Sequence, residues 1–303
     1  MRISSLSQPQ WMLSALENGN SQIQKLSDQL STQQKQSLPS EDPLNASRTA
    51  ALQQQQAVTA QYQQNITAVT GSLTSQETLL TSINNQVLAL QDQFRSMNNA
   101  SHTGAENPGY AAQIGSLTDG IVSLLNSQDA NGHYLFAGTN NTQPPVVKVD
   151  GQYQWQGNNQ TQSVQVGQQQ WIAGNTDAGT LFSSGEDAMG FLNQLTTLQT
   201  SLTQTGSNAT PDSGTLGELI RQSSDISDRV SSAVSSIGSR QNQLTRLTNV
   251  YTDLTTANSG VLSSLQSTDT AQTTLQLQSW LQTVEYSSKA YSLMNQFSLF
   301  DEM

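Results

Sequence analysis

Apolar residues recur at steps of three and four along two long stretches of the chain, with polar residues between them. The first stripe runs Tyr62, Ile66, Val69, Leu73, Gln76, Leu80, Ile83, Val87, Leu90, Phe94 and Met97. The second runs Ile226, Val230, Ala233, Ile237, Leu244, Leu247, Tyr251, Leu254, Val261 and Leu265, with Arg240 and Asn258 as polar breaks. Because a stripe this narrow must meet another helix to leave water, we expect the first and last thirds of the chain to pair.

The same spacing sets the bounds of the predicted helices. We expect helices over residues 5–33, 43–98, 110–128 and 188–202, and further helical segments over 215–258 and on to 293. Pro39 and Pro43 stop the first helix, and Ser40 or Asp42 can cap the second. The Gly- and Asn-containing stretches 99–109 and 203–214 predict loops.

Between residues 134 and 174 the period becomes alternating, which predicts short strands. We expect strands at residues 134–138, 146–149, 152–155, 163–166 and 168–172, with Asp150-Gly151 as a hairpin signal. Asn131, Gly132 and Gly138 are the predicted structural turn positions. Trp155 and Trp171 are expected to fill the small core of this insertion, with carbohydrate stacking as the alternative.

These elements predict a mainly α fold with a small β insertion, in which the N- and C-terminal segments form a long antiparallel helical bundle or coiled coil. We expect three parts. Residues 1–42 with 268–303 form a terminal helical domain that is disordered in the monomer, 43–138 with 215–267 form a helical rod, and 139–214 form an outward-facing β-rich insertion. Pro39, Ser40, Glu41, Asp42 and Pro43 form the expected inter-domain hinge.

Apolar positions of the two terminal helices form the expected assembly interface, since neither helix can bury its stripe alone. They are Leu13, Leu16, Ile23, Leu26, Leu30, Leu277, Leu281, Val284, Tyr291, Met294, Phe297, Leu299 and Phe300. Trp11 and Trp280 are expected to be packing anchors in the same segments.

Composition argues against several classes of function. The 303 residues are only 34% hydrophobic and 11% charged, with a net charge of -11 and 11 Lys and Arg. A scattered, minor basic content does not suit nucleic-acid binding. No apolar run approaches the roughly 18 residues needed to cross a bilayer, so we expect no membrane insertion. Residues 1–20 lack the apolar core of a signal peptide.

The side chains that most chemistry requires are scarce. Cysteine is absent, which excludes disulfides, thiolate nucleophiles and cysteine-ligated metals. The two histidines, His102 and His133, lie in a predicted loop and a predicted turn, and neither has the surroundings of a catalytic base. No metal-ligand pattern or phosphate-binding loop occurs. We therefore expect no catalytic, metal or cofactor site, and a building block of an assembly instead.

Five segments resemble the hook–filament junction proteins of the bacterial flagellum, a family related to flagellin. They are residues 1–4 (MRIS), 30–32 (LST), 39–47 (PSEDPLNAS), 131–138 (NGHYLFAG) and 293–300 (LMNQFSLF). The chain departs from the family pattern at Gln33-Gln34-Lys35, where Gly-Lys is common, and at His133, where Arg is common. Residues 139–214 have no match.

The resemblance implies a structural adaptor, with the proximal hook-associated junction protein on one side and flagellin on the other, that polymerises with itself as a ring layer. It also implies export without a cleaved signal, an export chaperone at the C-terminal region, and an extracellular place at the junction. Residues 5–33 and 270–300 would then line an inner tube, with 43–98 and 215–265 forming an outer wall. Flagellin itself, a type III secretion tip or translocator protein, and a muramidase-type enzyme are the alternatives.

Overall fold

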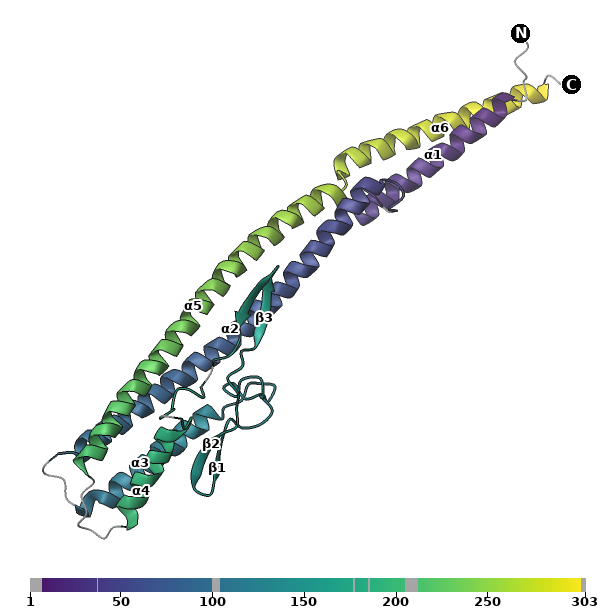
Figure 1. Ribbon diagram of the computed structural model, residues 1–303. Coiled ribbons are helices and arrows are strands. Elements are labelled where there is room, and N and C mark those ends of the chain that lie inside the picture. The colour runs from purple at the N-terminus through teal and green to yellow at the C-terminus, as the bar shows by residue number, and fades with distance from the viewer. Residues whose placement is uncertain are drawn as a thin grey trace. The chain divides into compact units, whose positions relative to one another are not determined.

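The computed structural model describes residues 7–36, 38–99, 104–176, 178–184, 186–204 and 212–300. Within these ranges the chain forms six α-helices, one short 3-10 helix and four strands (Figure 1). In chain order they are α1 (Ser7–Thr32), α2 (Pro43–Met97), η1 (Gly104–Glu106), α3 (Asn107–Leu125), β1 (Val146–Val149), β2 (Gln152–Trp155), β3 (Ser163–Gly167), β4 (Gln170–Ala173), α4 (Gly190–Gln204), α5 (Ser213–Gln266) and α6 (Thr270–Phe300). The predicted fold class, mainly α with a small β insertion, is confirmed.

Local signals account for where the long helices begin and end. Asp42 caps α2, because its carboxylate accepts the backbone N–H of Asn45 at 3.1 Å. Asp269 caps α6 by accepting the N–H groups of Ala271 and Gln272 at 3.0 and 3.1 Å. Helix α5 continues through Asn258, which is buried, and ends at Gln266. A polar residue in the seam therefore does not end the helix.

The described chain divides into two compact units. The first comprises Met1–Val58 and Asp253–Met303, and the second comprises Thr59–Thr252. In the first unit α1 and α6 run side by side in opposite directions (Figure 1). Two contacts define this pairing: Gly19 lies against Val284, and Gln34 forms an antiparallel bridge with Ser267. The three-part division expected from the sequence remains a prediction.

In the second unit, side chains of α2 and α5 meet along antiparallel lines. Gln91 donates to the carbonyl of Ile220, and Ser227 donates to Asn84 at 2.7 Å. The ring centroids of Tyr62 and Tyr251 are 5.8 Å apart. The predicted α2 stripe is buried at every position from Ile66 to Met97. On α5, Ile226, Val230, Ile237 and Leu244 are buried, whereas Val261 is exposed and Leu262 is buried in its place.

The four strands form two separate antiparallel hairpins, β1–β2 and β3–β4. The strand predicted at 134–138 is wrong: only an isolated bridge joins Tyr134 to Gln128. Leu135, Phe136 and Ala137 are buried one after another, which an alternating strand on a one-sided core cannot achieve. The segment instead turns into the core, with Gly138 at φ 73° pressed against the backbone of Asn158.

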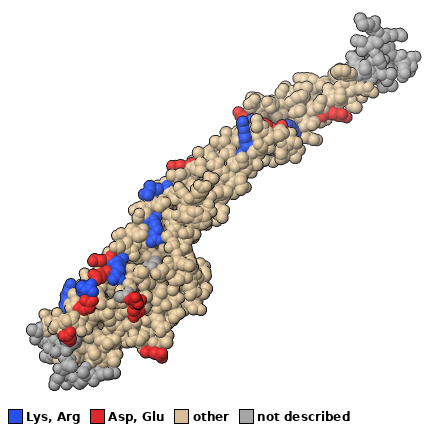
Figure 2. All heavy atoms as spheres, in the orientation of Figure 1, with Lys and Arg blue, Asp and Glu red and all other residues tan. Residues whose placement is uncertain are grey.

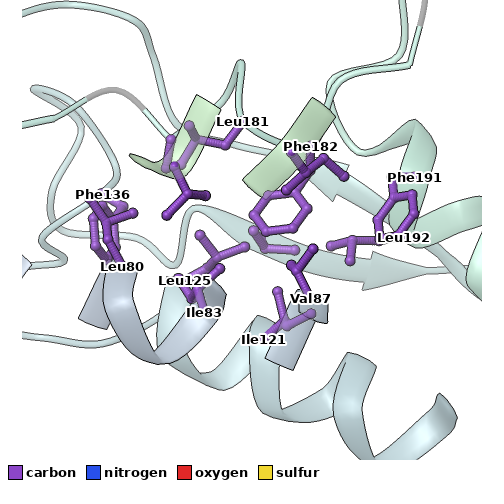
Figure 3. Packing of buried hydrophobic residues seen from close by; sticks show 14 of the residues in the cluster. Leu80, Ile83, Val87, Ile121, Leu125, Phe136, Leu181, Phe182, Phe191 and Leu192 are labelled. Atoms are coloured by element: carbon purple, nitrogen blue, oxygen red, sulfur yellow. The ribbon is translucent and has the colours of Figure 1, made fainter. Parts of the chain in front are cut away.

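The insertion does not have a core of its own. Val146, Tyr153, Val166 and Ile172 belong to the same buried cluster as α2, α3 and α4. Figure 3 shows how side chains of these helices converge on residues from the intervening loops. The labelled members are Leu80, Ile83, Val87, Ile121, Leu125, Phe136, Leu181, Phe182, Phe191 and Leu192. The expectation for Trp171 is wrong, since this side chain is 59% exposed, while Trp155 packs partly buried against the cluster.

Three asparagine side chains hold the hairpins by imitating a neighbouring strand. Asn126 accepts the N–H of Val146 at 3.0 Å and donates to its carbonyl at 2.8 Å. Asn193 does the same for Tyr153, at 2.7 and 3.1 Å. Asn175 accepts the N–H of Gln162 and donates to the carbonyl of Gln160. Each amide thereby satisfies backbone groups that a two-stranded sheet leaves unpaired at its edge.

Two arginines on one face of α5 secure the segment between β4 and α4. Arg240 donates to the carbonyls of Ala173 and Asn175, both at 2.9 Å, and burial lowers the pKa of its guanidinium. Arg229 donates to the carbonyls of Thr180 and Leu181 at 2.9 and 3.2 Å. The long segment without secondary structure is therefore held by charge-assisted hydrogen bonds.

Candidate assembly interface

One face of α1 is covered by α6. The seam of α1 consists of buried and half-buried residues at Met12, Leu16, Gly19, Ile23, Leu26 and Leu30, which recur at alternating steps of four and three. Such a pattern keeps one seam towards a single partner helix. The residues on the opposite side, including Ser21, Lys25 and Asp28, are exposed and polar. Helix α1 is therefore amphipathic in the ordinary sense.

The matching seam of α6 has the same rhythm. It consists of buried and half-buried residues at Thr273, Leu277, Trp280, Val284, Ser287 and Tyr291, with Ala290 also half-buried beside Tyr291. At Gly19 the two helices approach so closely that an added Cβ would overlap Val284, and it would also reach Trp280 at 3.9 Å. A glycine is required at this crossing because only a residue without a side chain leaves room for the branched Val284.

Helix α6 also carries apolar side chains on the face that α1 does not cover. Leu275, Tyr286 and Leu293 are 67%, 68% and 55% exposed. They are eleven and seven residues apart, so at about 100° per residue they point in one direction, opposite the seam. Leu281 lies next to the edge of the seam, outside this stripe, and is 49% exposed. A helix that is apolar on two sides is characteristic of an element buried on both.

Charge is nearly absent from α6. Its ionisable acid and base, Glu285 and Lys289, pair with each other across one turn at 2.7 Å. The hydrogen bond from Lys289 holds the pKa of the Glu285 carboxyl below its ordinary value. On the visible face in Figure 2, Lys and Arg are interspersed with Asp and Glu, and no large patch of one sign forms. A neutral helix surface loses little solvation free energy when another subunit covers it.

The structure sorts the residues of the expected assembly interface into two sets. Leu16, Ile23, Leu26, Leu30, Leu277, Val284 and Tyr291 lie in the seam between α1 and α6. Leu13, which is 50% exposed, and Leu281 lie outside it. Met294, Phe297, Leu299 and Phe300 fall in helix α6, but their side chains lie outside the described residues. Their role in assembly remains a prediction.

Sequence reasoning missed Met12, Gly19 and Thr273 as seam positions. Of the two expected packing anchors, Trp280 lies half-buried in the seam, whereas Trp11 is 77% exposed. A strict four–three rhythm counted back from Leu16 and Val284 selects Met12 and Trp280 in place of Leu13 and Leu281. Gly19 gives no hydrophobic signal, so only the distance to Val284 reveals its part.

The predicted hinge residues form a turn between α1 and α2. The N–H of Glu41 donates to the carbonyl of Leu38 at 3.1 Å, and its carboxylate pairs with Lys25 of α1 at 2.9 Å. Close by, the N–H of Lys35 donates to the carbonyl of Gln266, and that of Thr268 donates to the carbonyl of Gln33. The two breaks in the helices are thus tied to each other, and motion at Pro39, Ser40 and Pro43 remains a prediction.

The predicted turn positions have the backbone angles that glycine tolerates. Gly132 has φ 82° and Gly138 has φ 73°. Asp129 organises the first turn, because its carboxylate accepts the N–H groups of Asn131 and His133 at 2.8 and 2.9 Å. These hydrogen bonds lower the pKa of Asp129. The arrangement is a turn stabilised by a side chain.

The described residues contain neither a metal-binding cluster nor a membrane-spanning helix. Among the described residues, no three His, Cys, Asp or Glu side chains gather closely enough to hold a metal ion. Within the same ranges, none of the helices has both the length and the apolar character that a membrane span requires.

Comparison with known sequences identifies flagellar relatives. The family model for the bacterial flagellin N-terminal helical region matches residues 3–141. The flagellar hook-associated protein 3 of Salmonella typhimurium is 29% identical over 153 residues, which are 50% of this chain and 48% of that protein. The protein of the same name from Escherichia coli is 28% identical over 153 residues, with the same shares. The chain therefore spans about half the length of the curated relatives it matches.

Solved structures extend the likeness to most of the fold. A putative flagellar hook-associated protein from Vibrio parahaemolyticus has a TM-score of 0.70 at 26% identity, covering 75% of this chain and 100% of that one. The flagellar hook-associated protein 3 of Legionella pneumophila has a TM-score of 0.63 at 14% identity, covering 71% and 98%. The latter identity is too low to show more than a shared fold.

Proposed function

We propose that this chain is a structural adaptor between the flagellar hook and the flagellin filament, on the basis of its 29% identity over 153 residues to the flagellar hook-associated protein 3 of Salmonella typhimurium and its match to the flagellin N-terminal model over residues 3–141. Copies of it polymerise as a layer at that junction. The observation that carries the proposal is the two-sided apolar character of α6, where Leu275, Tyr286 and Leu293 are exposed opposite the α1 seam.

The partners follow from this role. The terminal helices pack against those of neighbouring copies, so that the exposed stripe of α6 leaves water only on assembly. The proximal hook-associated junction protein lies on one side of the layer and flagellin on the other. Before export, a flagellar chaperone holds the C-terminal region, whose stripe would otherwise favour aggregation. The protein acts outside the cell, in the flagellum, and leaves without a cleaved signal.

In this role the chain is a structural protein and not an enzyme. Its partly buried polar side chains form hydrogen bonds that hold the fold together. Asn126, Asn193 and Arg240, for example, donate hydrogen bonds to backbone carbonyls of the same chain. Flagellin is the second candidate, since the matching family model describes the flagellin N-terminal helical region. The amount of the protein in sheared filaments separates the two, because a filament subunit is far more abundant than a junction layer.

Substitution of Leu281 tests the proposal. Leu281 is 49% exposed and lies outside the α1 seam, so Leu281→Asp should leave the fold intact while placing a charge on a part of α6 that α1 does not cover. In cells whose own copy of the gene is deleted, this variant and a deletion of residues 293–303 should secrete hook proteins but grow no filament. Ser21→Asp, on the polar face of α1, is the matched control and should restore filaments. Filaments of normal length on the Leu281→Asp cells would refute the proposal.

A further inference from the structure

The β3–β4 hairpin holds one large aromatic side chain out in solvent. Val166 and Ile172 face the core, whereas Trp171, which pairs with Gln165 across the hairpin, is 59% exposed. The hairpin is anchored from behind. The hydroxyl of Tyr251 donates to the carbonyl of Val166 at 2.9 Å, and Asn65 donates to the carbonyl of Gln165 at 2.8 Å. Trp171 is thus an exposed aromatic side chain on a well-anchored hairpin. Residues of this kind often contribute most of the binding free energy at protein–protein interfaces.

The hairpin that carries Trp171 has no charged side chain of its own. From Gly151 to Thr176 the sequence contains no Asp, Glu, Lys, Arg or His. This neutrality matters because each copy has a net charge of -11. Copies of an acidic chain repel each other less where they touch through surfaces without carboxylates. The hairpin is therefore suited to contact between like-charged copies.

The first unit has a neutral pocket that such a side chain can enter. It has a volume of about 300 Å³, at the small end of pockets that hold organic groups. Leu38, Pro39, Ala46, Ala50 and Leu265 line it, and its remaining lining residues are Gln and Thr. Leu38 is 60% exposed at this site. We call this set of residues the Leu38 pocket.

We propose that Trp171 of one copy inserts into the Leu38 pocket of a second copy. The contact joins two different surfaces of the same chain, so each copy can both insert its own Trp171 and receive that of another copy. Heterologous contacts of this kind build closed rings or helical layers. The inference deepens the proposed adaptor function by naming one contact within its layer. A sugar platform is the weaker alternative, because Trp171 projects outwards and small ligands favour concave sites.

Cysteine cross-linking tests the contact directly, because the chain has no cysteine of its own. Gln170→Cys places a thiol beside Trp171, and Gln53→Cys places one in the wall of the Leu38 pocket; both positions are exposed. The two full-length variants, mixed at high protein concentration under mild oxidation, should form a disulfide-linked heterodimer. Gln152→Cys, exposed on the other hairpin, replaces Gln170→Cys in the control mixture and should cross-link at least about tenfold less.

Two further variants make the result specific. Adding Trp171→Ala to the Gln170→Cys chain, or adding Ala50→Trp to the Gln53→Cys chain so that the pocket is filled, should each lower the cross-linking rate at least about tenfold. Circular dichroism should show unchanged helix content, since Trp171 and Ala50 are both exposed. Cross-linking no faster than the control, or unchanged by Trp171→Ala, overturns the proposal. So does Trp171-dependent binding of a neutral oligosaccharide such as chitotriose without any cross-link.

The same experiment separates this contact from the adaptor function. If the cross-link fails while the unmodified gene restores filaments to deleted cells, the Trp171 contact is wrong and the adaptor function stands. If the cross-link forms but deleted cells grow normal filaments, the contact is real and the adaptor function is wrong.

Discussion

At the scale of single residues, asparagine side chains of the second unit form the hydrogen bonds that a neighbouring strand would otherwise form with the hairpins. A two-stranded hairpin leaves the outer N–H and C=O groups of both strands unpaired. Asn126 and Asn193 supply one donor and one acceptor each to Val146 and Tyr153. No sequence pattern distinguishes these two residues from the many other Asn residues of the chain, so this part of the fold was not predictable from sequence.

The substitutions Asn126→Asp and Asn193→Asp test this role. Each keeps the shape of the side chain but replaces the donating amide with a carboxylate that faces a backbone carbonyl. Each should lower the free energy of unfolding of the second unit by about 1–3 kcal/mol, measured by denaturant titration. Asn85→Asp, at an exposed position of α2, is the matched control and should change it by less than about 0.5 kcal/mol. Equal effects at all three positions would contradict the assignment.

Tyr153 gives the second unit a dependence on alkaline pH. Burial, together with the charge of Asp119 and the hydrogen bond to it at 3.2 Å, raises the pKa of Tyr153 to about 12 from an ordinary value of 10.0. The folded chain therefore keeps a proton that the unfolded chain loses, so this stabilisation is complete below pH 10 and is lost as the pH rises towards 12. Tyr153→Phe should lose less stability over that interval than the unmodified chain. Identical pH slopes from thermal unfolding of the two proteins would disprove the assignment.

At the scale of elements, the pairing of α1 with α6 depends on spacing more than on hydrophobicity. Helical periodicity correctly predicted both helices and much of their seam. It could not predict Gly19, because glycine is neither apolar nor helix-favouring. The sequence pattern also wrongly predicted a strand at residues 134–138. A short run of apolar residues gives the same pattern in a buried strand as in an irregular segment that enters the core.

Gly19→Ala and Gly260→Ala should have opposite effects on the same unit. In a helix that is otherwise unobstructed, Gly→Ala is stabilising by about 0.5–1 kcal/mol. Gly260 has open space around it and should follow that rule, whereas the methyl group of Gly19→Ala meets Val284 and should force α1 and α6 apart. In assembled copies, where α1 and α6 are both ordered, helix content followed by circular dichroism during heating should fall at lower temperature for Gly19→Ala, and at higher temperature for Gly260→Ala, than in the unmodified chain. A gain in stability from Gly19→Ala would show that the seam is misplaced.

At the scale of the whole molecule, the two compact units differ in how they bury apolar surface. The second unit has a contiguous core drawn from α2, α3, α4, α5 and the hairpins. In the first unit, Leu26 and Leu262 are the large apolar side chains that are buried among the described residues, at 6% and 8% exposure, while Leu275, Leu281 and Tyr286 remain exposed. A unit with so little enclosed apolar area recovers little of the conformational entropy lost in ordering two long helices. Its order should therefore depend on neighbouring copies.

The seam pattern and the low charge of the chain were enough to predict this contrast from sequence. The sequence did not predict which face of α6 contacts α1 and which face remains exposed. One face contacts α1, and the opposite face is left for an intermolecular partner. That division depends on which face α1 covers, and therefore on Gly19 and the turn at Gln33 to Lys35.

Hydrogen exchange of the purified full-length chain in dilute buffer tests the central claim most directly. The account predicts rapid exchange of backbone amides over residues 7–32 and 270–300, with slow exchange over residues 66–97 of α2 in the same sample. Protection of the terminal helices should appear only when copies assemble. If α1 and α6 are as well protected as α2 in the dilute monomer, the terminal pair is complete in a single chain, and the proposal that neighbouring copies complete it is wrong.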